Sequence, residues 1–266
     1  MEKIVIYCKS FIRDLDRAKI LAESVEQYNK DKIPFYISVP TSDVSLFKSK
    51  LPPTVQILSD ADIINNDIEQ SWVTQQIVKS SFWKTNISEN YVMVDSDSYF
   101  VRDFTLKDFM YNDSTPYTVC HEQKELWNWS VRFINQLGFN PKLSFMNDRQ
   151  VIMDVFQRQG RHLDFGPGPV IWSRKVWEVV EELMTENKFT WMDLMKISAS
   201  EFTWYGEALL YSKVIDLIPI EPPFKFFHYY QQYLESKSMG ITEWHIAQNY
   251  MGITLQSNWN NGVSKY

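Results

Sequence analysis

The stretch Tyr91-Val-Met-Val-Asp-Ser-Asp-Ser-Tyr-Phe100 decides the fold. Its first four residues are apolar and predict a buried strand, and the triplet Asp95-Ser96-Asp97 follows directly. In an open α/β sheet, ligands bind where the carboxyl ends of the parallel strands meet. The sequence therefore predicts two carboxylates at the ligand-binding edge of a sheet.

The residues before this stretch alternate short apolar runs with helical patterns, which is typical of βαβ units around a parallel sheet. Strands are predicted at 4–7, 34–39 and 55–58, and helices at 14–28, 43–50 and 71–85. The fold class is therefore α/β. We expect residues 1–100 to form a nucleotide-binding half of this fold.

The second part of the chain continues less regularly. Strands are predicted at 98–102, 117–120, 169–172 and 214–220, and helices within 125–159, at 174–188, at 200–213 and at 242–250. The rest of the segment from Pro222 onward reads as an irregular aromatic tail. We expect one domain over 1–266. Residues 101–266 would form the half that binds a second substrate, the acceptor, together with the tail.

Composition excludes several classes of protein. A formal net charge of −6 over 266 residues argues against nucleic-acid binding, which needs a basic surface. Cys8 and Cys120 lie in predicted strands, which suits a reducing cytoplasm better than a disulfide framework. No apolar run approaches the length of a spanning helix, so we expect a cytoplasmic protein. A membrane-linked acceptor would require peripheral docking at the inner face of the membrane.

The acidic triplet suits a hard divalent cation. Asp95 and Asp97 are two residues apart, so a turn can point both carboxylates at one Mn²⁺ or Mg²⁺ ion, which takes oxygen ligands and keeps open positions for phosphate. Such an ion stabilises a departing diphosphate as a Lewis acid. An isolated triplet of this kind is also common in ordinary turns and helix caps.

Several short pieces of the chain resemble known enzymes. They are Q-Q-x-x-K at 75–79, V-D-S-D at 94–97, G-P-V-I-W-S at 168–173, S-E-F-x-x-Y-G at 200–206, and an aromatic-histidine segment at 226–230. Together they resemble the GT-A glycosyltransferases, and more narrowly a bacterial family known mainly as a domain of unknown function. The resemblance implies a GT-A fold, a mixed Rossmann-like sheet flanked by helices with an acceptor-side C-terminal subdomain.

The resemblance also implies roles for individual residues. Asp95 and Asp97 would bind the metal ion, with Asp95 also reaching the donor ribose, and His228 would be the third metal ligand. Packing between aromatic rings is an equal alternative for His228. Lys79 would face the diphosphate or the base of a nucleotide-sugar donor, UDP-linked by expectation, unless it is a solvated helix residue.

Two glutamates are candidates for the general base that an inverting transferase needs. Glu201 comes first, because it stands at the start of a predicted helix within a matching piece, although a helix N-terminus also favours a structural carboxylate there. Glu207 is the alternative. The acceptor would be a glycan or lipid-linked glycan, as in the synthesis of bacterial surface polysaccharide.

The Gly-Pro-Gly-Pro stretch at 166–169 offers backbone that can approach a ligand closely. Gly166, Gly168 and Trp172 are therefore weak candidates for donor or sugar binding. A plain tight turn is an equal alternative.

Three rival classes fit less well. A haloacid dehalogenase-type phosphatase carries its D-x-D on the first strand and has a later acidic pair, whereas here the triplet follows the fourth strand and no Asp-Asp pair occurs downstream. A nucleotide-sugar pyrophosphorylase opens with a glycine-rich loop, whereas residues 8–12 contain no glycine. A non-catalytic module that binds carbohydrate or Ca²⁺ remains open as an alternative.

Overall fold

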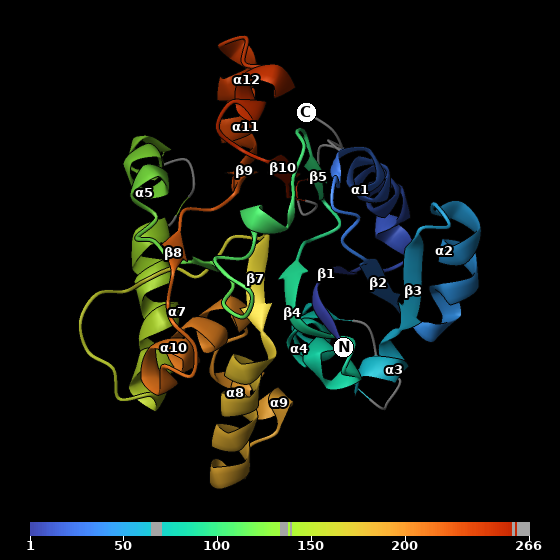
Figure 1. Ribbon diagram of the computed structural model, residues 1–266. Helices are drawn as coiled ribbons and strands as arrows, with labels where there is room; N and C mark the ends of the chain where they lie inside the picture. Colours follow the sequence, from blue (N-terminus) through green and yellow to red (C-terminus); the bar gives the residue numbers. More distant parts are fainter. Residues whose placement is uncertain (65–70, 134–137, 139, 257–258, 260–266) are drawn as a thin grey trace.

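A computed structural model of the protein describes residues 1–64, 71–133, 138, 140–256 and 259. Its main sheet has the order β3 (Val55–Ser59), β2 (Phe35–Val39), β1 (Glu2–Lys9), β4 (Ser88–Met93), β7 (Val170–Ser173). The first four strands are parallel, and β7 runs antiparallel to β4 (Figure 1). The predicted α/β class is confirmed, with a mixed central sheet.

Helices cover both faces of this sheet, because side chains alternate along each strand. On β1, Val5 and Tyr7 face one core, while Ile4, Ile6 and Cys8 face the other. The first core is covered by α3 (Asp60–Ile64), α4 (Trp72–Ser81), α7 (Pro141–Val155), α8 (Arg174–Asn187), α9 (Trp191–Ile197) and α10 (Glu201–Ser212). The second is covered by α1 (Leu15–Tyr28) and α2 (Val44–Lys50).

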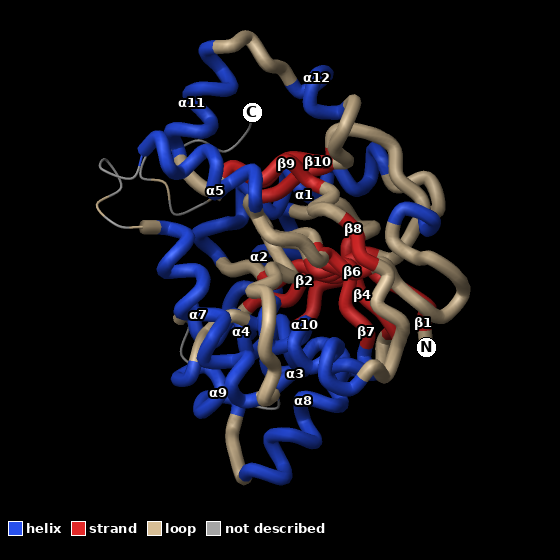
Figure 2. The backbone as a smooth tube through the Cα atoms, turned by 90° about the vertical axis from the view of Figure 1, so that its left-hand side faces the viewer, coloured by secondary structure: helices blue, strands red, loops and turns tan. Residues whose placement is uncertain are grey.

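A second, smaller sheet is made from segments far apart in the sequence. Its central strand β10 (Gly252–Leu255) runs antiparallel to β5 (Ser98–Phe100) and parallel to β9 (Phe224–Phe227). Beyond it lie α11 (Tyr230–Ser238) and α12 (Glu243–Ala247), which Figure 2 shows at one end of the molecule. The expectation of an irregular tail is wrong for β9, β10 and α11, whereas the helix predicted at 242–250 is confirmed over Glu243–Ala247 as α12.

The remaining elements are short. They are β6 (Thr118–Val119) paired with β8 (Pro219–Ile220), α5 (Lys124–Ser130), and the 3-10 helices η1 (Ile12–Asp14), η2 (Thr41–Asp43), η3 (Phe82–Thr85), η4 (Leu106–Asp108) and η5 (Val131–Phe133). The strand predicted at 214–220 shrinks to its last two residues. Helices α3 and α9 were not predicted, and part of the helical region predicted at 125–159 falls outside the described residues.

Two further expectations can be compared with the structure. Both cysteines are free; Cys8 is buried, and Cys120 is half-buried just after β6. Among the described residues, no helix combines the length and the apolar character needed to cross a bilayer.

Candidate active site

The acidic triplet forms the turn between the two sheets. The Ser98 amide donates to the carbonyl of Asp95 at 3.1 Å, which closes the turn after β4. The Leu255 amide on β10 donates to the carbonyl of Asp97 at 3.0 Å. Backbone hydrogen bonds thus fix both ends of the triplet.

Lys79 connects this turn to two helices. Its Nζ lies 2.6 Å from Oδ1 of Asp95 and 3.5 Å from Oε1 of Glu201. The Lys79 and Glu201 side chains are 7% and 4% exposed, whereas that of Asp95 is 30% exposed. Asp95 is therefore the member of this cluster that a ligand from solvent can reach.

The cluster determines the charge of its members. Burial lowers the pKa of the Lys79 ammonium, but the carboxylates of Asp95 and Glu201 outweigh burial and raise it. Burial raises the pKa of Glu201, and the ammonium of Lys79 opposes that effect. Lys79 is consequently a permanent cation, held between two acidic side chains.

Local structure explains why these groups converge. The hydroxyl of Tyr91 on β4 donates to the Lys79 carbonyl at 3.2 Å, which ties α4 to the strand that precedes the triplet. Glu201 is the first residue of α10, where the helix dipole favours a carboxylate. The alternative that Lys79 is a solvated helix residue is wrong, because the residue is 6% exposed.

The carboxylates of Asp95 and Asp97 match a hard divalent cation in ligand chemistry, since both supply oxygen. Within the described part of the chain, no group of three metal-ligating side chains is assembled in one place. Strand register nevertheless brings His228 into the neighbourhood. Leu255, which bonds to Asp97, pairs with Phe227, so the residue before His228 lies two strand spacings, about 10 Å, from Asp97.

His228 packs against an aromatic ring, as the alternative interpretation of this residue expected. It packs on the ring of Phe226, with a centroid separation of 4.5 Å, and it also lines a cavity with His121. Burial lowers the pKa of its imidazole to about 4. The ring is therefore neutral near pH 7, in the form that coordinates metal ions.

Glu207 lies in a different environment from Glu201. Both of its oxygens accept hydrogen bonds from the guanidinium of Arg158, one of them from Nη2 at 2.6 Å, and the residue is fully buried. This bidentate pair leaves Glu207 without an accessible oxygen for an acceptor hydroxyl.

The Gly-Pro-Gly-Pro stretch runs beside the triplet. A side chain at Gly168 would meet Oδ2 of Asp95 at 3.7 Å, so the Gly168 backbone lies close to the Asp95 carboxylate. The carbonyl of Gly166 lies 2.7 Å from Nε2 of His121. Trp172 is 1% exposed and packs on Tyr91, so its ring is not available to a ligand.

Sequence reasoning missed a second buried ion pair at the same sheet edge. Lys9, the last residue of β1, lies 2.9 Å from Asp60, the first residue after β3. Burial lowers the pKa of Lys9, and Asp60 opposes that effect. A polar residue directly after a buried strand placed Asp95 at the sheet edge. The same signal was present in the sequence for Lys9 and Asp60.

It also missed the surroundings of Asp164, which is 4% exposed. This carboxylate accepts from the side chains of Gln123 at 2.5 Å and Arg149 at 3.1 Å. Its backbone pairs with His121 through two hydrogen bonds. Asp164 thereby fixes the 120–123 segment beside the Gly-Pro-Gly-Pro stretch.

Comparison with known proteins gives one assignment. No curated protein shows significant similarity to the chain. A family model described as a family of unknown function, DUF6492, matches residues 4–218, which is more than half of the sequence. The chain therefore belongs to the DUF6492 family of unknown function.

Proposed function

We propose that this chain is a metal-dependent glycosyltransferase of the GT-A type. It transfers a sugar from a nucleotide-sugar donor, UDP-linked by preference, to a glycan or glycolipid acceptor. The observation that carries the proposal is the position of Asp95-Ser96-Asp97 directly after β4, with Lys79 in contact with Asp95. This is the sheet edge where α/β folds bind nucleotides.

In this proposal, Asp95 and Asp97 hold a Mn²⁺ or Mg²⁺ ion, and His228 completes the protein ligands. The bound ion supplies balancing charge for the diphosphate leaving group. The Asp95 side chain is accessible to the ion, and the turn is held by backbone bonds to Ser98 and Leu255. The turn thus presents the two aspartates from a fixed backbone.

Lys79 supplies a fixed positive charge next to this ion site. Its ammonium neutralises Asp95 before any ligand arrives, and it then stands beside an incoming diphosphate. Glu201 is buried and engaged with Lys79, so its position suits orientation of the lysine better than direct contact with an acceptor.

Ligand binding tests the donor site. A ligand that binds only the native state raises the melting temperature. We expect UDP to raise it in the presence of Mn²⁺ and not in the presence of EDTA. The Asp97→Asn variant should lose this shift, while Asp148→Asn, which changes an exposed carboxylate on α7, should keep it.

Turnover tests the activity. We expect wild type to hydrolyse at least one nucleotide sugar with Mn²⁺, and Asp97→Asn to be slower by at least about 100-fold. Turnover that survives both Asp97→Asn and EDTA would contradict the metal role. Binding of a glycan or Ca²⁺ with no turnover of any nucleotide sugar would instead indicate a non-catalytic module.

A further inference from the structure

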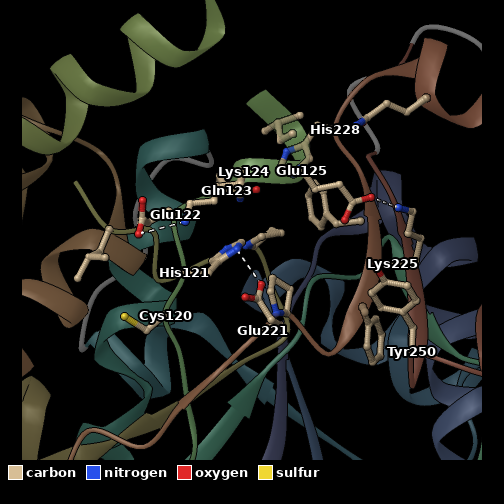
Figure 3. A pocket seen from close by; sticks show the side chains of 17 residues that line it. Cys120, His121, Glu122, Gln123, Lys124, Glu125, Glu221, Lys225, His228 and Tyr250 are labelled. Atoms are coloured by element: carbon tan, nitrogen blue, oxygen red, sulfur yellow. Dashed lines mark hydrogen bonds and ion pairs between the residues drawn. The ribbon is translucent and has the colours of Figure 1, made fainter. Parts of the chain in front are cut away.

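A cavity of about 530 Å³ opens next to the donor site. One wall is the segment 120–126 after β6, and the opposite wall comes from β9 and Tyr250 (Figure 3). Pro167 closes it from the side of the Gly-Pro-Gly-Pro stretch. The next residue, Gly168, has its backbone beside the carboxylate of Asp95. The Pro167-Gly168 segment therefore lies between the cavity and Asp95.

The charges in the cavity disfavour an anionic ligand. Its lining has three glutamates, Glu122, Glu125 and Glu221, against two lysines. Each lysine is already paired: Lys225 lies 2.9 Å from Glu125, and Lys124 lies 3.7 Å from Glu122 (Figure 3). A phosphate group would therefore meet an excess of carboxylate rather than an available cation.

The same lining suits a neutral ligand rich in hydroxyl groups. Carboxylates and the amide of Gln232 are hydrogen-bonding partners for hydroxyls. The half-buried rings of Phe226 and Tyr250 add apolar surface for the C–H faces of a sugar ring. Polar groups combined with a few aromatic faces are typical of small-molecule sites.

Glu221 is the most accessible acid in this cavity, with its side chain 83% exposed. Its Oε2 lies 3.2 Å from Nδ1 of His121, and Nε2 of the same ring lies 2.7 Å from the Gly166 carbonyl. A carbonyl oxygen only accepts, so the contact with Gly166 places a hydrogen on Nε2, and the Nδ1 edge of the ring faces Oε2 of Glu221. The His121 ring therefore lies between the Gly-Pro-Gly-Pro stretch and Glu221.

We infer that this cavity is the acceptor site, that it takes an uncharged saccharide, and that Glu221 is the general base. The inference rests on the proposed function. It gives Glu221 the role of general base, for which the sequence suggested Glu201. The acceptor hydroxyl oxygen forms a bond to the anomeric carbon of the donor sugar. The bond from that carbon to the β-phosphate oxygen breaks, its electron pair leaves with the nucleoside diphosphate, and the hydroxyl proton passes to the Glu221 carboxylate.

Ligand-observed NMR tests the cavity without any donor. The probes are the methyl glycosides of glucose, galactose, mannose and N-acetylglucosamine, with inorganic phosphate as the charged competitor. We expect saturation transfer to at least one glycoside in wild type. In Tyr250→Ala, this saturation-transfer signal should fall at least threefold. Added phosphate should leave the glycoside signal unchanged in both proteins. Silence from all four glycosides, an undiminished signal in Tyr250→Ala, or displacement by phosphate would overturn the assignment.

Kinetics tests the base. With a glycoside acceptor, we expect Glu221→Gln to lower kcat for transfer by about 100-fold or more and to keep the Kd for UDP with Mn²⁺ within twofold. Glu186→Gln, which changes an exposed acid on α8, is the matched control. Equal transfer by Glu221→Gln and the control would overturn the base assignment. So would loss of transfer in Glu201→Gln at unchanged donor affinity.

The proposed function and the assignment of the cavity can fail separately. Wild type that binds no UDP with Mn²⁺ and turns over no nucleotide sugar would overturn the proposed function, and with it the base. The glycoside signal still decides which ligand the cavity takes, because it needs neither donor nor metal. Melting temperatures of each variant, measured alongside, identify any loss that comes from unfolding.

Discussion

The ammonium of Lys79 lies 2.6 Å from the carboxylate of Asp95, at the point where a metal-dependent transferase would place a divalent cation. The lysine comes from α4 and the aspartate from the turn after β4. The protein therefore carries an internal cation next to its candidate metal site. This cation stabilises the acidic cluster and would compete with a bound metal ion for Oδ1 of Asp95.

Removing this cation separates the two effects. In Lys79→Met we expect Mn²⁺ alone to bind about tenfold more tightly, because Oδ1 of Asp95 is released and the local potential becomes more negative. Without metal, the free energy of unfolding should fall by about 3–5 kcal/mol, since Glu201 is left as a buried charge. Electron paramagnetic resonance of free Mn²⁺ and urea unfolding measure the two quantities.

Lys84→Met is the matched control, because Lys84 follows the same helix but pairs with Glu181 at the surface. Lys84→Met should change the free energy of Mn²⁺ binding and the free energy of unfolding by less than about 1 kcal/mol each. An unchanged Mn²⁺ affinity in Lys79→Met would show that Lys79 does not compete with the ion.

The buried pair of Lys9 and Asp60 predicts a non-additive mutant cycle. Lys9→Met and Asp60→Asn should each cost about 3–5 kcal/mol, because each leaves the partner charge or its hydrogen bonds without compensation. The double variant should be more stable than either single variant, within about 2 kcal/mol of wild type. Urea unfolding of all four proteins completes the cycle, and simple additivity would contradict a coupled pair.

Cys120 predicts an unusual pH dependence of alkylation. Burial, followed by the charge of Asp164, raises the pKa of its thiol to about 11. A raised pKa keeps the thiol protonated, so at pH 8 its thiolate population should be about 100-fold below that of an ordinary cysteine. The rate with iodoacetamide, followed by mass spectrometry, should rise nearly tenfold per pH unit between 8 and 10.

The Cys120→Ser variant serves as its control. Only Cys8 then remains, and it is fully buried, so the folded protein should not react. A rate for Cys120 that levels off below pH 9 would contradict the raised pKa.

Substitution of Glu207 should lower the stability of the protein without lowering its turnover. In Glu207→Gln, the bidentate pair with Arg158 loses its charge, and we expect the free energy of unfolding to fall by about 3 kcal/mol. Turnover per folded molecule should stay within about threefold of wild type, because Arg158 already occupies both oxygens. Abolished turnover at unchanged stability would restore Glu207 as a candidate base.

The main sheet was predictable from sequence because its signals are local. The runs that became β1, β2, β3, β4 and β7 are apolar, bounded by polar or turn residues, and separated by helical patterns. The second sheet was not predictable in this way. Its strands β9 and β10 are four residues long, and β10 finds its partner β5 across more than 150 residues of chain.

The residues of the candidate site were likewise predictable only where they follow a recognisable strand. Asp95 and Asp97 follow a recognisable strand, so their place at the sheet edge could be argued from sequence. Glu221 and His121 could not be singled out, since each follows a two-residue strand and they meet only through β6 and β8. Gly206 illustrates a tertiary constraint of the same kind: inside α10 it leaves room for the ring of Phe165, which a side chain would strike at 2.0 Å.

The pairing of β10 with the triplet has a consequence during protein synthesis. Ser98 and Thr254 share a hydrogen bond across 156 residues, and the amide bound to the Asp97 carbonyl belongs to the next residue, Leu255. At typical elongation rates a ribosome needs roughly 8–30 s to cover that distance. The nascent chain thus carries its acidic turn for that time without the strand that secures it. The acidic turn should therefore reach its final geometry late, after residues 252–255 have left the exit tunnel.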